Sequence, residues 1–295
     1  MKKKARRPVA DKRSLLQAIQ GLEQRLDRAQ DAGLAGEKRL NQALGLGLAN
    51  AVRQMEAFLG IQHYLQTGEG ITGFHGWPIS PDVGLLLLDK IRENGYALII
   101  EFGSGTSTVL LAKALNTLVR TRGEPAAWQS HRLVHRIVSF EHDPRYLNDT
   151  ARLLDTHAAA DRVRLLHAPL IDWLHGEQVF HFYDCAAELA RLDTTLGHAP
   201  ARILVLVDGP PGRTCPLARY PAIPLLFQHL GRHHIDIVLD DANRTEEQAA
   251  IEAWRAHWQA RSTRIEEHFP ASEKGLYFAA TSPPTAPPHH HEHIE

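Results

Sequence analysis

Hydrophobic positions in the first part of the chain recur with a helical period. One stripe, at steps of four, three, four and three residues, is formed by Leu15, Ile19, Leu22, Leu26 and Ala29. Gly33 and Gly36 fall where this stripe should continue, and glycine costs a helix interior about 1 kcal/mol relative to alanine. We therefore expect a first helix over residues 14–30 and a second over about 37–66.

Two interpretations of this helical extension, residues 14–66, fit the pattern. In the first, the helices form a short coiled coil that pairs two copies of the chain as a homodimer. In the second, they form a helical hairpin that packs on the rest of the chain. The stripe extends over three heptads at most, so the sequence leaves both interpretations open.

Beyond a boundary rich in Gly and Pro (residues 67–81), short apolar segments alternate with helical ones. The expected strands are residues 97–102, 136–140, 163–167, 203–207 and 235–239, with a terminal strand near 275–279. The expected helices between them are residues 107–119, 144–157 and 245–258. Continuous, β-branched-rich runs are typical of buried parallel strands. The pattern predicts an α/β domain over residues 67–280, with a Rossmann-like, doubly wound, mostly parallel sheet.

Composition and charge narrow the class of protein. The run Val83 to Leu88 is far shorter than the roughly 20 residues that cross a bilayer, so no membrane span is expected. The basic start is followed by Pro8 and polar residues instead of an apolar core, and two cysteines give no disulfide framework, which together favour a cytoplasmic protein. Residues 1–13 form a basic tail and residues 281–295 a Pro- and His-rich tail, both expected to be disordered. Aromatic and basic residues do not interleave, so no nucleic-acid partner is expected.

The segment from Leu98 to Thr108 combines a hydrophobic strand, an acid, a glycine turn and a helix that opens on hydroxyl residues. Glycines let the backbone approach a ligand closely, and a helix N-terminus offers free N–H groups. Dinucleotide-binding domains share this arrangement, but Thr108 stands where their third glycine would be. The acid before the turn, Glu101, suits an ammonium group better than a pyrophosphate.

The next expected strand ends on Glu141, His142 and Asp143. In Rossmann-like folds an acid at this strand end binds ribose hydroxyls, which makes Glu141 the candidate ribose ligand. Asp143 precedes Pro144 and is expected to cap the helix that begins there. Further along, His167 and Ala168 lie in a loop at the same edge of the sheet, where they could flank an adenine ring.

Carboxylates follow the last two parallel strands. Asp208 ends one strand, and Asp240 and Asp241 end the next. Because the carboxyl ends of parallel strands meet at one edge, these groups should converge and repel one another unless a cation or substrate lies among them. Oxygen ligands of this kind suit Mg²⁺. Alternatively, Asp240 or Asp241 caps the helix near Thr245 and Asp208 alone meets the substrate.

These motifs, in this order, resemble those of bacterial class I S-adenosylmethionine-dependent methyltransferases. The matching segments are Trp77–Asp82, Glu101–Thr108, Glu141–Asp143 and Asp208–Gly212, within a span from Trp77 to Phe278. The resemblance implies a cofactor site made of Trp77, Ile79, Ser80, Glu101, Gly103, Ser104, Gly105, Ser107, Thr108, Glu141, His142, His167, Ala168 and Asp208. It places the methionyl end at Glu101, Gly103 and Gly105.

The three aspartates also resemble the Mg²⁺ ligands of catechol-type and macrolide-sugar O-methyltransferases, although the Gly-Pro-Pro-Gly loop after Asp208 departs from their pattern. The sequence thus predicts O-methylation of a sugar or another small-molecule or glycan hydroxyl, with S-adenosyl-L-methionine, Mg²⁺ at Asp208, Asp240 and Asp241, and Asp208 as the catalytic residue. Three alternatives remain: an NAD-dependent oxidoreductase, an aminopropyl transferase, and a non-catalytic scaffold with a degenerate Rossmann-like domain.

Overall fold

The computed structural model of the chain describes residues 12–65 and 79–282. The chain divides into two compact units, Met1–Arg53 and Gln54–Glu295. Trp77 and most of the two predicted tails, residues 1–11 and 283–295, lie outside the described residues. Within the described ranges, no helix is both long enough and apolar enough to cross a membrane.

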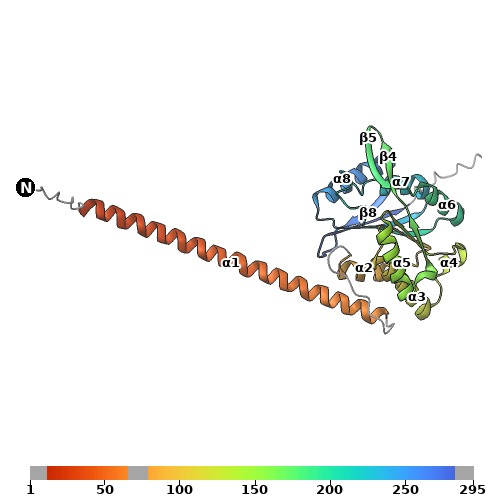
Figure 1. Cartoon of the computed structure of the whole chain (residues 1–295), viewed down its shortest axis with the longest axis horizontal. Coiled ribbons are helices and arrows are strands. Elements are labelled where there is room, and N and C mark those ends of the chain that lie inside the picture. The colour runs from red at the N-terminus through yellow and green to blue at the C-terminus, as the bar shows by residue number, and fades with distance from the viewer. Residues whose placement is uncertain (1–11, 66–78, 283–295) are drawn as a thin grey trace, which may run out of the picture. The chain divides into compact units, whose positions relative to one another are not determined.

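The N-terminal segment is one helix, α1 (Lys12–Leu65), and not two (Figure 1). The expected break at Gly33 and Gly36 is therefore wrong, and the helical hairpin is not formed. Glycine lowers helix stability but can adopt helical dihedral angles. No proline follows these glycines to end the helix, and the residues on both sides are good helix formers.

The second unit contains a seven-stranded sheet in the order β3-β2-β1-β6-β7-β9-β8. The parallel strands are β1 (Leu98–Phe102), β2 (Ile137–Glu141), β3 (Val163–His167), β6 (Arg202–Val207) and β7 (His234–Asp240). β9 (Leu276–Ser282) runs antiparallel to β7 and to the edge strand β8 (Arg264–His268). This confirms the predicted Rossmann-like, mostly parallel fold.

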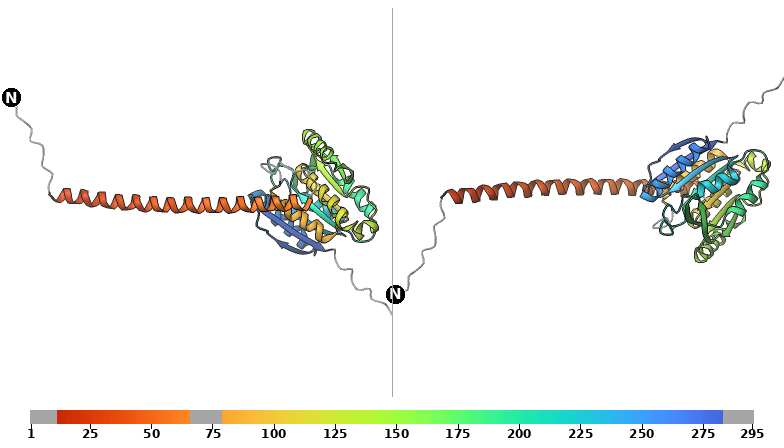
Figure 2. Two further views of the ribbon diagram at one scale, coloured as in Figure 1. Left: turned by 90° about the horizontal axis from the view of Figure 1, so that it is seen from below. Right: turned by 90° about the horizontal axis from the view of Figure 1, so that it is seen from above.

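Helices cover both faces of this sheet (Figures 1 and 2). On one face lie α2 (Pro81–Asn94), α3 (Thr106–Arg122), the short α4 (Ala126–Ser130) and α5 (Pro144–Thr156), whose buried residues share one hydrophobic cluster. On the other face lie α6 (Ala186–Leu196), α7 (Ala222–Leu230) and α8 (Thr245–Ala260), which share a second cluster. The sequence did not predict α2, α4, α6 or α7.

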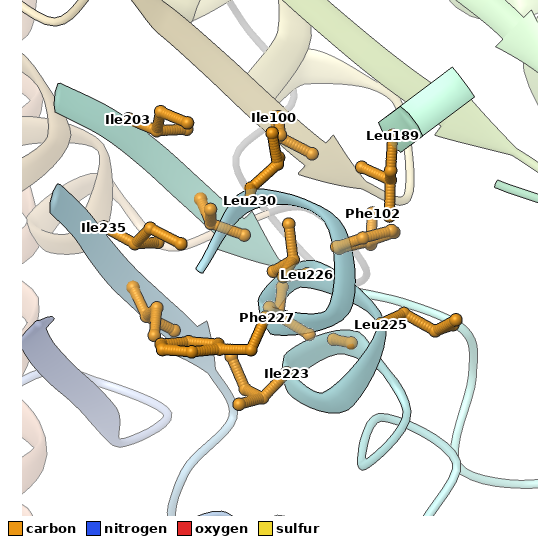
Figure 3. Packing of buried hydrophobic residues seen from close by; sticks show 14 of the residues in the cluster. Ile100, Phe102, Leu189, Ile203, Ile223, Leu225, Leu226, Phe227, Leu230 and Ile235 are labelled. Carbon is orange, nitrogen blue, oxygen red and sulfur yellow. The ribbon is translucent and has the colours of Figure 1, made fainter. Parts of the chain in front are cut away.

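The two clusters explain why the strands read as continuous hydrophobic runs. Successive strand residues point to opposite faces, so Ile100 and Phe102 pack with α7 while Ile99 packs with α2 and α3. Figure 3 shows the first cluster, in which Phe227 and Leu226 of α7 lie beside the strands. A sheet covered on both faces exposes its polar groups at the strand ends, where the site lies.

A two-stranded hairpin interrupts the alternation of strands and helices between β3 and α6. It consists of β4 (Leu170–His175) and β5 (Gln178–Tyr183), paired antiparallel. The sequence pattern predicted only a loop at its start. The second strand of the hairpin ends at Tyr183, which lies near the carboxyl ends of the parallel strands.

Candidate functional site

The glycine bend after β1 packs directly against the loop after β6. Gly103 has φ +94°, and a side chain there would meet the backbone of Asp208 and Gly209 at 3.3 Å. Both the dihedral angle and the close approach require glycine. Backbone hydrogen bonds from Gly103 to Phe140 (2.9 Å) and from Asp208 to Phe102 (3.0 Å) extend the ladders into the bend. The bend therefore connects the carboxyl ends of β1, β2 and β6.

Glu101, at the end of β1, is completely buried. Its Oε2 accepts hydrogen bonds from the hydroxyls of Thr108 (2.6 Å) and Ser139 (2.7 Å). Its Oε1 has no hydrogen-bond partner among the described residues. Burial raises the pKa of Glu101 to about 7, against the lowering effect of the neighbouring hydroxyls. Thr108, which stands where dinucleotide-binding domains have a third glycine, thus donates a hydrogen bond to Glu101.

Glu141, at the end of β2, is tied to the glycine bend. Its Oε2 accepts from the backbone N–H (3.1 Å) and the hydroxyl (3.2 Å) of Ser104, and its Oε1 accepts from the N–H of Asp143 (2.9 Å). His142 Nδ1 lies 3.0 Å from Oε1. Burial acts to raise the pKa of Glu141, but the hydrogen bonds from His142, Asp143 and Ser104 outweigh it and lower the pKa. Glu141 is therefore ionised at neutral pH.

A pocket opens between these elements. Its lining consists of Gly103, Ser104, Glu141, His142, Tyr146, Tyr183, Asp208, Gly209, Pro211 and Arg213. Five of the predicted site residues are among them: Gly103, Ser104, Glu141, His142 and Asp208. They come from β1, β2 and β6, far apart in sequence, and meet because parallel strands end at one edge.

Tyr183 is a pocket residue that the sequence analysis missed. Its ring packs against Phe102, with ring centroids 5.8 Å apart, and its hydroxyl lies against Gly209, where a side chain would clash with it. Burial, together with the negative charge of Glu141, raises the pKa of Tyr183, so the hydroxyl stays protonated. The hairpin that carries it was not predicted, so no sequence pattern placed Tyr183 near Asp208.

Asp208, Asp240 and Asp241 meet as expected at the ends of β6 and β7. One carboxylate oxygen from each lies within 4.8 Å of the others. Asp240 and Asp241 are buried, whereas the Asp208 side chain is 17% exposed. Burial, followed by repulsion from Asp240, raises the pKa of Asp208 well above its ordinary value. The helix-capping alternative is wrong, because α8 has Arg244 at its N-cap and no side-chain cap.

A buried arginine, also missed by the sequence analysis, lies within this aspartate cluster. The Arg219 side chain is 4% exposed, and its guanidinium donates to the backbone carbonyls of Asp240 (2.8 Å) and Asp208 (3.1 Å). It also lies 3.2 Å from the Asp241 carboxylate and 3.5 Å from that of Glu247. Burial acts to lower the pKa of Arg219, but these acids raise it. Arg219 therefore carries a fixed positive charge and connects β6 to β7.

The donor set of the aspartate cluster fits a divalent cation. Both carboxylate oxygens of Asp240 and Oδ1 of Asp241 are buried without a hydrogen-bond partner in the described chain. Four acids face three basic groups, since Arg244 also pairs with Asp241 (2.8 Å) beside Arg219, and the charge of Lys274 acts on Asp240. Orphaned, charge-rich oxygens of this kind are what Mg²⁺ binds.

The other predicted residues occupy supporting positions. Asp143 caps α5 as expected, its Oδ1 accepting from the N–H of Arg145 (2.8 Å). Ala168 donates its N–H to the carbonyl of Glu141 (2.8 Å), and His167 Nε2 lies 3.1 Å from the carbonyl of His142. The described cofactor residues of the prediction that do not line the pocket are Glu101, Gly105, His167 and Ala168, together with Ile79 and Ser80 at the start of α2 and Ser107 and Thr108 in α3. Gly105 is the N-cap of α3, and its N–H donates to the Thr108 hydroxyl (3.0 Å).

No family model and no curated protein matches this sequence. Solved structures with a similar chain trace include an O-methyltransferase from Bacillus cereus in complex with SAH, at 14% identity and TM-score 0.48, covering 77% of this chain and 90% of that one. Another is the O-methyltransferase TomG from Streptomyces achromogenes in complex with SAM, at 16% identity, with the same coverage and TM-score. A third is the SAH-bound methyltransferase PaMTH1 from Podospora anserina, at 14% identity and TM-score 0.43, covering 76% and 86%. Similarity at this level concerns the fold alone.

Proposed function

We propose that this chain is an S-adenosylmethionine-dependent methyltransferase that methylates a hydroxyl oxygen of a small molecule or glycan. The observation that carries the proposal is the ionised carboxylate of Glu141, hydrogen-bonded to the glycine bend and lining the pocket. An acid at this strand end binds ribose hydroxyls in Rossmann-like folds. Asp208 lines the same pocket, and the ionised Glu141 suits a sulfonium better than a pyrophosphate.

In the proposed reaction the sulfur–methyl bond breaks as the oxygen–methyl bond forms. The cofactor is already activated, so the protein contributes alignment, charge and removal of the hydroxyl proton. Glu141 holds the ribose, and Gly103, Ser104 and Gly105 cradle the methionyl end. The unpartnered Oε1 of Glu101 behind the bend suits the methionyl ammonium. Asp208, as a carboxylate of the pocket lining, receives the acceptor proton.

We assign Asp208, Asp240 and Asp241 as the ligands of a divalent cation, Mg²⁺ in the first instance. A cation bound there would lower the pKa of an acceptor hydroxyl that is otherwise far too basic to ionise at neutral pH. The resemblance of the sequence motifs makes a sugar hydroxyl the first acceptor class to test.

Isothermal titration calorimetry with S-adenosylhomocysteine, S-adenosylmethionine and NAD tests the cofactor assignment. We expect both S-adenosyl compounds to bind and NAD not to bind. Glu141→Gln should weaken binding about 10- to 100-fold, because it removes a charged acceptor of two hydroxyl hydrogen bonds. Glu177→Gln, at the exposed turn of the hairpin, is the matched control and should bind normally. Binding of NAD alone would favour an oxidoreductase and overturn the proposal.

Mass spectrometry of products from a panel of glycosides and catechols separates the remaining alternatives. A gain of one methyl group supports the proposal, and a gain of an aminopropyl group contradicts it. Titration with Mg²⁺ after chelation tests the cation. We expect activity to depend on Mg²⁺, and Asp240→Asn to weaken Mg²⁺ binding in calorimetry while leaving S-adenosylhomocysteine binding within a few-fold of the wild type.

A further inference from the structure

The part of α1 in the first unit presents an uncovered apolar surface. Every residue from Leu22 to Ala49 is exposed. Eight leucines between Leu16 and Leu48 each expose between 53% and 68% of their surface. Apolar surface on this scale marks an interaction site. A single amphipathic helix also gains most of its stability from packing, which the described residues of this unit do not supply.

Three glycines of the same segment approach no other described part of the chain. A side chain built at Gly33, Gly36 or Gly47 would meet nothing within 4 Å. Glycine weakens a helix interior relative to alanine, so open space around it offers no reason for its presence. Small residues do allow two helix backbones to approach closely, which points to a second helix on the side where they lie.

Small and large residues alternate along one heptad stripe. The stripe, at steps of four and three, is Leu22, Leu26, Ala29, Gly33, Gly36, Leu40, Ala43 and Gly47. In an antiparallel pair of helices the first core position of one heptad faces the second core position of the other chain. Turning this stripe end over end gives four facing pairs: Leu22 with Gly47, Leu26 with Ala43, Ala29 with Leu40, and Gly33 with Gly36.

Each leucine of the stripe then faces a small residue of the other helix, which is how a core is filled without voids. The glycines at the centre bring the backbones close. A parallel, in-register pair would instead stack Gly33 on Gly33 and Gly36 on Gly36, leaving empty layers between leucine layers. The flanking positions agree, since Glu23 faces Leu44 and Arg25 faces Leu46, and no like charges meet.

We propose that residues 22–47 of two copies of this chain pair as an antiparallel coiled coil. The partner of the exposed stripe is thus a second copy of the chain, because its large residues face the small residues of the first copy. The inference is independent of the proposed methyl transfer, because none of these residues belongs to the pocket or the aspartate cluster.

Analytical ultracentrifugation of the full chain tests the association. We expect a dimer at micromolar concentration and at least a 100-fold weaker association for Leu26→Asp. The near-ultraviolet circular dichroism of the full chain reports the folding of the α/β unit and should not change in that variant, because residues 22–47 contain no aromatic residue. A wild-type chain that stays monomeric at these concentrations would overturn the proposal. A monomer that binds anionic vesicles would overturn it as well, and would make a membrane surface the partner of the stripe.

Cysteine cross-linking tests the direction. In a Cys215→Ser background, the double variant Leu22→Cys, Gly47→Cys should form a covalent dimer on mild oxidation. Either single variant should not, because residues 22 and 47 lie about 37 Å apart along a helix at 1.5 Å per residue. Covalent dimers of the single variants would instead indicate a parallel pair and contradict the proposed register.

Two matched glycine substitutions test the close approach. Gly36→Leu places a large side chain in the centre of the proposed interface and should weaken dimerisation at least 10-fold. Gly45→Leu lies on the opposite side of the helix and should leave dimerisation unchanged or strengthen it, because leucine favours helix over glycine. Equal effects of the two would show that the stripe is not the contact surface.

Discussion

Two groups of acids lie at the same edge of the sheet, and they are stabilised in different ways. Glu101 and Glu141 accept hydrogen bonds from hydroxyls and backbone N–H groups. The aspartates at β6 and β7 surround the guanidinium of Arg219, and both oxygens of Asp240 have no hydrogen-bond partner in the described chain. The first group uses hydroxyls, backbone N–H groups and the imidazole of His142, whereas the second surrounds a buried guanidinium.

The difference indicates which ligand charge each half can accept. The hydrogen bonds of Ser104, Asp143 and His142 keep Glu141 ionised, so this half remains attractive to hydroxyls and cationic groups. On the other half, Arg219 offsets only part of the charge, and a further cation is still favourable. Variants that change one half and not the other therefore test whether the two are as distinct as the geometry indicates.

The largest effect is expected for Arg219→Met. Removing one partner of a buried ion cluster leaves uncompensated charges, which costs about 3 to 5 kcal/mol. We expect this loss in the free energy of unfolding by urea, and we expect Mg²⁺ to restore more of it in the variant than it adds to the wild type, because the ion replaces the lost positive charge.

Arg244→Met is the matched control. Arg244 also pairs with Asp241, but its side chain is 53% exposed, and such pairs contribute about 1 kcal/mol or less. A loss for Arg219→Met as small as that of Arg244→Met would show that the aspartates do not depend on a buried cation, and the contrast between the two halves would not hold.

Glu101→Gln should give the next largest effect, and in the opposite direction. The pKa of Glu101 rises from 4.5 to about 7 on folding, so its contribution to stability is full below pH 4.5 and is lost as pH rises through 7. Above that pH the folded protein carries a buried, unfavourable charge. We therefore expect Glu101→Gln to raise the free energy of unfolding by about 2 to 3 kcal/mol at pH 8, and by little at pH 4.5.

The same variant should bind S-adenosylhomocysteine less tightly, because the amide cannot pair with the methionyl ammonium as a carboxylate does. Stability and binding would then change in opposite directions, as expected for an acid retained for its function. Lower stability at pH 8 would show instead that Glu101 is a structural residue whose charge is fully compensated.

The convergence of the acids could be predicted from sequence because each directly follows a hydrophobic strand. Glu141 is the last residue of β2, and Asp208 directly follows the last residue of β6. Both therefore lie at one edge of the sheet, because parallel strands end there. Arg219 could not be placed this way, since it follows an irregular loop with no periodicity to show where it points. Only the folded loop brings its guanidinium back between Asp208 and Asp240.

Local helix and strand propensity did not predict two other features, the length of α1 and the β4–β5 hairpin. Gly33 and Gly36 weaken a helix without ending it, so their presence alone did not fix the length of α1. In the hairpin, strand β4 is mostly half-buried or exposed and gave no continuous apolar run, and Tyr183 reaches the pocket through pairing with that strand. Pairing between β4 and β5 determines the position of Tyr183, whereas in α1 the flanking helix formers outweigh the two glycines.

A smaller effect is expected for Ser139→Ala, which removes one of the hydroxyls that hydrogen-bond to Glu101. A hydrogen bond to a charged group contributes about 1.5 to 3 kcal/mol when the charge is present. We therefore expect a loss of about 1.5 to 2 kcal/mol in urea unfolding at pH 8 and a smaller loss at pH 5, where Glu101 is protonated. Ser130→Ala, on an exposed turn of α4, is the control and should show no dependence on pH.

Tyr183→Phe should have the smallest effect on folding, because the ring contacts with Phe102 and Phe182 remain. The hydroxyl lines the pocket together with Glu141 and Asp208, so its loss removes a donor from the space where cofactor and acceptor meet. We expect the free energy of unfolding to stay within about 1 kcal/mol of the wild type. The value of kcat/KM for the acceptor should fall about threefold to tenfold, as for one neutral hydrogen bond. A large loss of stability with unchanged kcat/KM would make Tyr183 a packing residue.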